Sequence, residues 1–190
     1  MKYLFILFLI FANNFYGQNV RATESLWDLI RSNSNLKYDS ERIEIIKASD
    51  KYNSNQYLIN RLSKNGQRYL YYTVKEGLRK NLPVELSLIP FVESQFDPYA
   101  RSATGASGIW QFIPSTAREN GLKKNWWYDG RRDIVASTEA AYGFLSKLYE
   151  RYGDWLIAIA AYNAGPSRIK KEIEKNKKNG LPTDFWSLNL

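Results

Sequence analysis

The chain has 190 residues, 44% of them hydrophobic, and a formal net charge of +8 at pH 7. This length fits about one domain with its own core, and the basic balance favours an anionic partner such as a cell-wall polymer, a membrane surface or nucleic acid. The chain contains no histidine and no cysteine, which excludes a Ser-His triad, a cysteine nucleophile and a zinc site built from these residues. Acid-base chemistry must therefore use carboxylates, tyrosine or lysine.

Residues 1–18 are predicted to be an export signal. A lysine at position 2 precedes an almost wholly apolar run over 3–12, and polar residues follow. Such a run suits a signal-peptide core and is too short to span a bilayer as a helix. We predict cleavage after Gly17; an uncleaved segment would hold the protein near the membrane, and a buried helix is the alternative. Without a cysteine to acylate we expect no lipid anchor, and we expect location in the periplasm or cell envelope, or secretion.

Residues 19–80 are predicted to form a helical extension ahead of the main domain. Three polar positions can each cap a helix by accepting a bond from a free backbone N–H, namely Thr23, Asp39-Ser40 and Ser54. The third helix is expected to continue to Leu78 despite Gly66, and the polar stretch 32–35 to be a connection. No strand-like alternation of useful length occurs, so the fold is predicted to be all-α.

The segment 82–94 carries the residue on which the function most depends. Pro83 suits the first position of a helix, and the apolar pattern that follows ends at Glu93. Pro90 lies inside this pattern and should kink or end the helix just before Glu93. A carboxylate at the solvent-facing end of an apolar helix loses part of its hydration to the neighbouring apolar groups. This raises its pKa and lets it donate a proton near neutral pH. A plain solvated helix-end carboxylate is the alternative.

The rest of the chain is predicted to be irregular at first and then helical. Asp97-Pro98 favours a turn, and Gly105 and Gly108 keep the following stretch non-helical. Periodicity then predicts four helices. The first begins near residue 114, the second and third span about 133–151 and 154–162, and the fourth begins at 166. The helix at 154–162 is apolar nearly all round and should be the buried centre of the domain. The lysine-rich run 170–178 should be a solvated helix end.

Four short motifs occur in a fixed order: LPVEL at 82–86, ES at 93–94, GASGIWQ at 105–111 and AYNAG at 161–165. In this order and spacing they resemble the soluble lytic transglycosylase family, and within it the membrane-bound murein transglycosylase D type, a likeness strengthened by PTDFWSL at 182–188. The resemblance covers roughly residues 60–190. It implies a lysozyme-like catalytic domain, for which we predict the boundaries 81–190, that cleaves the glycan strands of peptidoglycan.

The resemblance implies that Glu93 is the single acid-base residue. It would protonate the glycosidic oxygen between N-acetylmuramic acid and N-acetylglucosamine. Its conjugate base would then deprotonate the sugar's 6-hydroxyl, which attacks the anomeric carbon and leaves a 1,6-anhydro end. Asp97, the nearest second acid, reads better as a turn initiator, and Asp129 and Asp133 as members of an ion-pair loop. No second carboxylate is then required, because the substrate's acetamido oxygen can stabilise the developing cation.

The family pattern also implies a set of substrate-contacting residues, Ser102, Gly108, Gln111, Tyr162 and Asn163. Ser102 and Gln111 correspond to positions that contact the N-acetyl groups or position the substrate, and Gly108 would let the backbone approach the sugar. Tyr162 corresponds to a tyrosine whose hydroxyl bonds the catalytic carboxylate, and Asn163 to a sugar contact. Each has a structural alternative: Ser102 and Gln111 as surface polar residues, Gly108 as a loop glycine, Tyr162 as a core ring and Asn163 as a helix terminator.

The expected partner is the glycan strand of peptidoglycan, with other envelope proteins as further partners. No metal or cofactor is expected, and no nucleic acid, because no nucleic-acid motif is visible. Two rival functions stay open: a muramidase that uses water, and a peptidoglycan-binding module without turnover. The LysM repeats that accompany the transglycosylase D type do not occur in the sequence, so we expect the cleft, the basic surface or a partner to bind the wall.

Overall fold

The computed structural model describes residues 26–37, 39, 41–47 and 56–190, with 56–63 and 67 described by their backbone alone. Over this part of the chain the regular structure is helical. The β-type pairing found there consists of isolated antiparallel bridges in the loops, Arg101 with Ser107, Ser107 with Phe112, and Lys124 with Asp129. The prediction of an all-α fold is therefore confirmed.

The N-terminal part of the described chain contains short helices and one long one. Helix α2 spans Leu26–Ser32, residues 43–47 form a further short helix, and α4 spans Gln56–Arg79. The caps proposed at Thr23, Ser40 and Ser54 lie outside the described residues. Asp39, also proposed as a cap, accepts a hydrogen bond from the N–H of Glu41 at 3.1 Å, before the helix at 43–47 begins.

The continuation of α4 through Gly66 is confirmed, and the ring of Phe91 supplies a reason for the glycine. A Cβ atom at position 66 would lie 2.8 Å from that ring. The missing side chain thus lets α4 approach the segment that carries Glu93. Leu70 and Val74 on the same helix are buried in the core.

The segment before Glu93 is a 3-10 helix, η1 (Val84–Leu88), followed directly by an α-helix, α5 (Ile89–Ser94). Pro83 is the residue before η1 rather than its first helical residue. Pro90 lies in the first turn of α5, where its missing N–H costs no intrahelical bond. The predicted distortion ahead of Glu93 is confirmed as this change of helix type.

The second half contains α6 (Pro114–Glu119), α7 (Ile134–Tyr152), α8 (Trp155–Ala164) and α9 (Pro166–Lys178). These are the four helices that the periodicity predicted. Asp133 and Asp154 cap α7 and α8, since each carboxylate accepts a bond from an N–H in the first turn, at 2.9 and 3.0 Å. The lysines of α9 are exposed, which confirms the solvated helix end.

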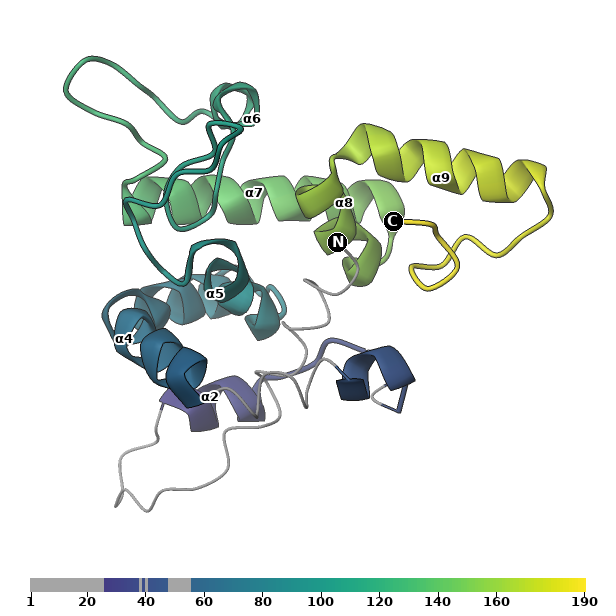
Figure 1. The fold of residues 1–190 in the computed structure, drawn as a ribbon, viewed down its shortest axis with the longest axis horizontal. Helices are drawn as coiled ribbons and strands as arrows, with labels where there is room; N and C mark the ends of the chain where they lie inside the picture. Colours follow the sequence, from purple (N-terminus) through teal and green to yellow (C-terminus); the bar gives the residue numbers. More distant parts are fainter. Residues whose placement is uncertain (1–25, 38, 40, 48–55) are drawn as a thin grey trace.

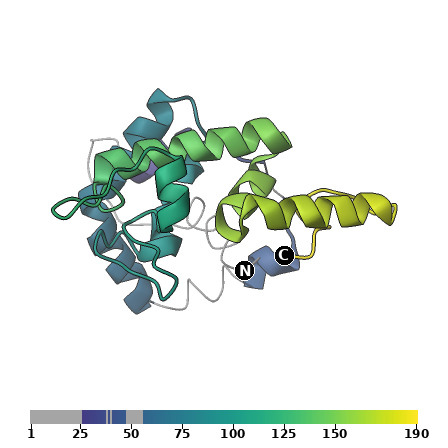
Figure 2. The ribbon, with the colours of Figure 1, turned by 90° about the horizontal axis from the view of Figure 1, so that it is seen from above.

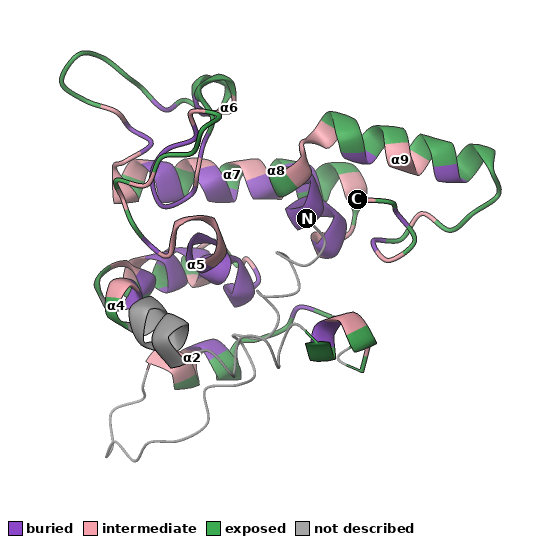
Figure 3. Ribbon diagram, in the orientation of Figure 1, coloured by how far each residue is buried: buried purple, intermediate pink, exposed green. Residues whose placement is uncertain are grey.

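Helix α7 organises the domain, because it packs against both α8 and α4. Figure 1 shows α7 across the middle of the molecule, with α5 and α4 on one side and α6 with its loop on the other. From above, α9 extends away from the body (Figure 2). Residues 156–161 of α8 are all buried, as Figure 3 shows, so the prediction of a buried central helix is confirmed.

Both ends of the described chain are fastened to this domain. Glu85 of η1 is fully buried, and its Oε1 accepts bonds from the Ser34 hydroxyl and from the N–H groups of Asn35 and Leu36, at 2.6 to 2.9 Å. At the other end, the buried Asn176 of α9 donates to two carbonyl oxygens of the C-terminal tail. The segment before α4 therefore belongs to the same packed body.

Two predictions about the N-terminal half are not decided by the fold. Residues 1–18, the predicted export signal, lie outside the described residues. The boundary at residue 80 stays a prediction, although α4, on its N-terminal side, packs on η1 and α7 and shares their core. Among the helices described here, none combines the length and the apolar character that crossing a membrane requires.

Candidate functional site

Glu93 lies in the last turn of α5, and the next residue fixes this end of the helix. The hydroxyl of Ser94 donates to the carbonyl oxygen of Ile109 at 2.9 Å and lies 3.2 Å from that of Pro90. Gln95 then adopts a left-handed conformation with φ of 55°, which ends the helix. The direction of the Glu93 side chain is thus set by a bond between α5 and the loop 101–112.

Glu93 lines a cavity of about 260 Å³ whose other walls come from α6 with the loop before it, from α7 and from the junction of α8 and α9. The lining residues include Gln111, Phe112, Thr116, Phe144, Tyr162 and Asn163. Glu93 is the one carboxylate among the described residues of this lining. No group of three or more acidic side chains in the described chain is placed to hold a metal ion.

The Glu93 carboxyl is partly buried and accepts no hydrogen bond from any described residue. Burial raises the pKa of Glu93 to about 7, because the ionised form loses solvent without gaining a donor in exchange. The raised pKa that the sequence predicted is therefore present. At neutral pH this group exists in both protonated and ionised forms, which is what a residue that first gives and then takes a proton requires.

Gly108 is needed for packing inside the loop 101–112. Its φ is +82°, and a Cβ there would lie 1.7 Å from the carbonyl oxygen of Arg131. Arg131 is itself buried, forms an ion pair with Asp129 at 2.6 Å, and donates to the carbonyl oxygen of Gly105 at 2.8 Å. The expected ion-pair loop is confirmed for Asp129, whereas Asp133 caps α7 and forms no ion pair among the described residues. The approach of Gly108 to a sugar stays a prediction.

Gln111 reaches the cavity from a strained backbone. Its φ is +50°, in the left-handed region, which costs a residue other than glycine about 1 kcal/mol or more. The side-chain amide nitrogen donates to the carbonyl oxygens of Gly108 at 2.8 Å and Ala100 at 3.3 Å. Both amide hydrogens are thereby used, so the amide oxygen is the part of Gln111 that keeps capacity for a ligand.

Tyr162 and Asn163 reach the same cavity from the end of α8. The Tyr162 hydroxyl donates to the carbonyl oxygen of Trp110 at 2.8 Å, so the predicted bond from this hydroxyl to Glu93 is not the one formed. Burial, followed by the nearby Glu93 charge, raises the pKa of Tyr162 well above its ordinary value, which keeps the hydroxyl a donor. Asn163 donates to the carbonyl oxygen of Ile159 within α8 and does not end the helix.

Ser102 lies on the surface and outside the cavity lining. Its hydroxyl bonds that of Thr104 at 2.8 Å and accepts a bond from the N–H of Ala106 at 3.0 Å, so it closes its own turn. The fold thus gathers some of the predicted residues around one cavity and leaves Ser102 and Gly108 outside it. Those it gathers are Glu93, Gln111, Tyr162 and Asn163. Their roles toward a substrate stay predictions.

Several residues that build or wall this site are not among those predicted from the sequence. Ser94 and Arg131 position the loop opposite Glu93, and Phe144 and Thr116 form part of the wall. Ser94 had a signal, since it stands beside Glu93 in the family motif. Phe144 has no such signal, because nothing local in the sequence distinguishes a core ring from one that borders a cavity.

Comparison with known proteins identifies the same region. The family model of the transglycosylase SLT domain matches residues 71–183. The chain is 41% identical over 175 residues to membrane-bound lytic murein transglycosylase D of Escherichia coli K12, covering 92% of this chain and 38% of that relative. It is 30% identical over 108 residues to membrane-bound lytic murein transglycosylase F of Desulfosudis oleivorans, covering 53% of this chain and 22% of that relative.

A third relative is membrane-bound lytic murein transglycosylase F of Maricaulis maris, 32% identical over 127 residues, which cover 61% of this chain and 26% of the relative. The chain thus spans well under half the length of each of these relatives. The family model itself matches more than half of this chain and includes every residue of the Glu93 cavity. The chain therefore belongs to the family of transglycosylase SLT domains.

Proposed function

We propose that this chain is a peptidoglycan lytic transglycosylase that cleaves the β-1,4 bond between N-acetylmuramic acid and N-acetylglucosamine. The observation that carries the proposal is a partly buried Glu93 with a pKa raised to about 7, facing a cavity formed by the family's motifs. Family membership supports the same reaction class, as do relatives named lytic murein transglycosylases.

In the proposed mechanism protonated Glu93 gives its proton to the glycosidic oxygen as the bond to the anomeric carbon breaks. The resulting carboxylate then takes the proton from the 6-hydroxyl of the same muramic acid, whose oxygen attacks the anomeric carbon. The products are a 1,6-anhydro end and a free 4-hydroxyl, and no water is consumed. Glu93 returns to its protonated form, so one carboxyl serves both steps.

The absence of a second carboxylate among the described residues of the cavity supports substrate assistance. A glycosidase of the usual kind places two carboxyl groups on either side of the scissile bond. Here the acetamido oxygen of the substrate would stabilise the developing cation instead, as in the known exceptions to that rule. The amide oxygen of Gln111 and the side chain of Asn163 are the polar groups of the cavity suited to hold N-acetyl groups.

The proposed place of action is the cell envelope. The basic chain would be attracted to the anionic wall, and the predicted signal at residues 1–18 would export it. The relatives' names describe membrane-bound murein enzymes. Other envelope proteins are further proposed partners, and an uncleaved signal segment would keep the domain near the membrane.

The test is a digest of purified peptidoglycan sacculi with the full chain, analysed by liquid chromatography and mass spectrometry. Muropeptides with anhydro-muramic ends, one water lighter than hydrolysis products, are expected. Reducing muramic ends would instead identify a muramidase that activates water through a second catalytic group. A folded sample that binds sacculi and releases nothing would identify a binding module.

A further inference from the structure

The loop between α6 and α7 carries two tryptophans at its tip that the proposed reaction does not use. Trp126 and Trp127 are 88% and 90% exposed. The tip is a built turn, because the Asn125 side-chain oxygen accepts bonds from the N–H groups of Trp127 at 2.9 Å and Tyr128 at 2.7 Å. A backbone bond from Asn125 to Tyr128 at 2.8 Å closes it. Two large apolar rings are thus held in solvent by a fixed turn, an arrangement typical of a binding surface.

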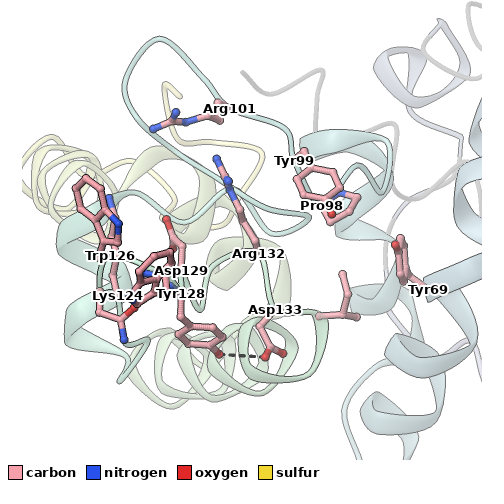
Figure 4. Close-up of a pocket in the computed structure, with 13 residues that line it drawn as sticks. Tyr69, Pro98, Tyr99, Arg101, Lys124, Trp126, Tyr128, Asp129, Arg132 and Asp133 are labelled. Carbon is pink, nitrogen blue, oxygen red and sulfur yellow. Dashed lines mark hydrogen bonds between the residues drawn. The ribbon is translucent and has the colours of Figure 1, made fainter.

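Both tryptophans line a second cavity of about 600 Å³, which shares no lining residue with the Glu93 cavity. Across this hollow from the tip lie Tyr99, which is 74% exposed, and Tyr69 of α4 (Figure 4). Rings on both sides of an open hollow offer flat apolar faces to a ligand. Pyranose rings have matching apolar faces, so a saccharide suits the space between them.

The same hollow contains cations without acidic partners. Arg101, Lys124 and Arg132 line it, and among the described residues none of them has a carboxylate within ion-pair distance. In the view of Figure 4 the guanidinium groups of Arg101 and Arg132 lie between Trp126 and Tyr99. Unpaired cations beside aromatic rings favour a ligand that carries carboxylates as well as sugar rings.

The two carboxylates of this lining do not cancel that charge. Asp129 is engaged by Arg131, which lowers the pKa of the Asp129 carboxyl. Asp133 accepts one bond from the Tyr128 hydroxyl at 3.0 Å, drawn dashed in Figure 4, and another from the N–H of Ala136. The four cations Arg101, Lys124, Arg131 and Arg132 outnumber these two carboxylates, so a net positive charge at the hollow is left for a ligand.

We propose that this hollow is a second, non-catalytic peptidoglycan site, which holds sugar rings between the tryptophan tip and Tyr99 and pairs its cations with the carboxylates of stem peptides. The identity of the polymer rests on the proposed function; the anionic and saccharide character of the ligand rests on the hollow itself. A bilayer fits these observations less well, because a flat membrane would meet the convex tip alone, whereas the cations and Tyr99 face a concave space.

The test separates binding from cleavage by using the full chain with Glu93→Gln. Its sedimentation is measured with intact sacculi and with chitin, an uncharged β-1,4-linked polymer of N-acetylglucosamine. In this background Trp126→Ala with Trp127→Ala should weaken binding to both polymers by about tenfold. Arg101→Ala with Lys124→Ala should weaken binding to intact sacculi by about tenfold and leave binding to the uncharged chitin unchanged.

Matched controls remove similar groups elsewhere on the surface. Tyr71→Ala removes an aromatic ring that is 58% exposed on α4, and Lys177→Ala with Lys178→Ala removes two exposed cations of α9. Both controls should sediment like the parent, and circular dichroism checks that every variant is folded. Binding by the tip and cation variants equal to that of the parent would overturn the inference.

Vesicles containing anionic phospholipid supply the second decisive comparison. If the tip variant loses vesicle binding and retains sacculus binding, the surface is a membrane contact and the inference is wrong. The proposed function is read separately, from the products of the native chain. If the native chain releases no anhydro-muramic ends, the proposed function is wrong and the sedimentation result still stands. If the native chain releases these ends but the tip and cation variants bind like the parent, only the second site is wrong.

Discussion

The segment η1–α5 carries a glutamate near each end, and the two side chains have opposite surroundings. Glu85 is fully buried, and one of its oxygens accepts three hydrogen bonds from the N-terminal segment 34–36. Glu93 borders a cavity and accepts none from the described chain, and burial raises its pKa to about 7. Glu85 holds two parts of the fold together, whereas Glu93 is left without a donor and with a raised pKa.

Burial alone therefore does not decide what a carboxylate does. At Glu85 three converging donors replace the lost water around Oε1, whereas Oε2 is buried without a partner among the described residues, so one oxygen fastens the N-terminal segment. Around Glu93 nothing replaces the water, so the neutral acid becomes the more favourable form at moderate pH. Four experiments test this contrast between the two glutamates and its consequences.

The largest expected effect is the loss of cleavage in Glu93→Gln. The amide has nearly the same shape but cannot donate a proton as an acid, so we expect the rate of muropeptide release to fall by about 10³-fold or more. The control is Asp97→Asn, which removes the nearest other acid and keeps the oxygen that accepts the N–H of Tyr99 at 2.8 Å. That control should cut sacculi nearly as fast as the native chain. Comparable losses in both variants would contradict a single acid.

The second experiment removes the fastening carboxylate. Glu85→Ala leaves the N–H of the buried Leu36 and the partly buried donors of Ser34 and Asn35 without their acceptor, so we expect the free energy of unfolding to fall by about 3 kcal/mol. Urea unfolding followed by circular dichroism measures the loss. Glu85→Gln keeps one carbonyl oxygen and should lose less. A Glu85→Ala protein as stable as the native chain would show that the segment 34–36 is not held by this residue.

The third experiment measures how much the raised pKa of Glu93 lowers the free energy of unfolding. Below pH 4.5, the ordinary value, Glu93 is protonated in both the folded and unfolded states, and Glu93→Gln should change little. As the pH rises from 4.5 to about 7, the unfolded chain loses the proton while the folded chain retains it, so the native protein loses stability. Above pH 7 we therefore expect Glu93→Gln to be more stable than native by about 1–3 kcal/mol. Urea unfolding of both proteins at pH 4 and pH 8 measures this, and equal differences at the two values would contradict the raised pKa.

The smallest expected effect is that of Tyr162→Phe. The Trp110 carbonyl loses its donor, and Trp110 directly precedes Gln111, so the cavity wall should loosen and the cleavage rate should fall by about threefold to tenfold. Tyr142→Phe is a matched control, since its hydroxyl donates to the carbonyl oxygen of Thr73 in the core. Both should lose about 1 kcal/mol of stability, but only Tyr162→Phe should be slower. Equal rates would limit the Tyr162 hydroxyl to a structural role.

Much of the fold could be predicted from the sequence, because local sequence signals mark where its helices begin and which of them are buried. Asp133 and Asp154 cap α7 and α8, Pro90 marks the change of helix type, and the apolar run of α8 identifies the centre. The desolvation of Glu93 could also be predicted, since the apolar helix leading to it is visible in the chain itself. These features depend on residues within one or two turns of each other.

Tertiary structure alone decided how the site is assembled. The family motifs predict Glu93 as the acceptor of the Tyr162 hydroxyl, whereas the loop 101–112 brings the Trp110 carbonyl to that hydroxyl at 2.8 Å. The same loop turns Ser102 to the surface, while Gly108 leaves room for the backbone carbonyl of Arg131. Each of these outcomes depends on contacts between residues far apart in the chain, whose geometry is fixed by packing rather than by local pattern. Residue types and spacing therefore determined which chemistry the chain carries, and packing determined which partner each side chain has.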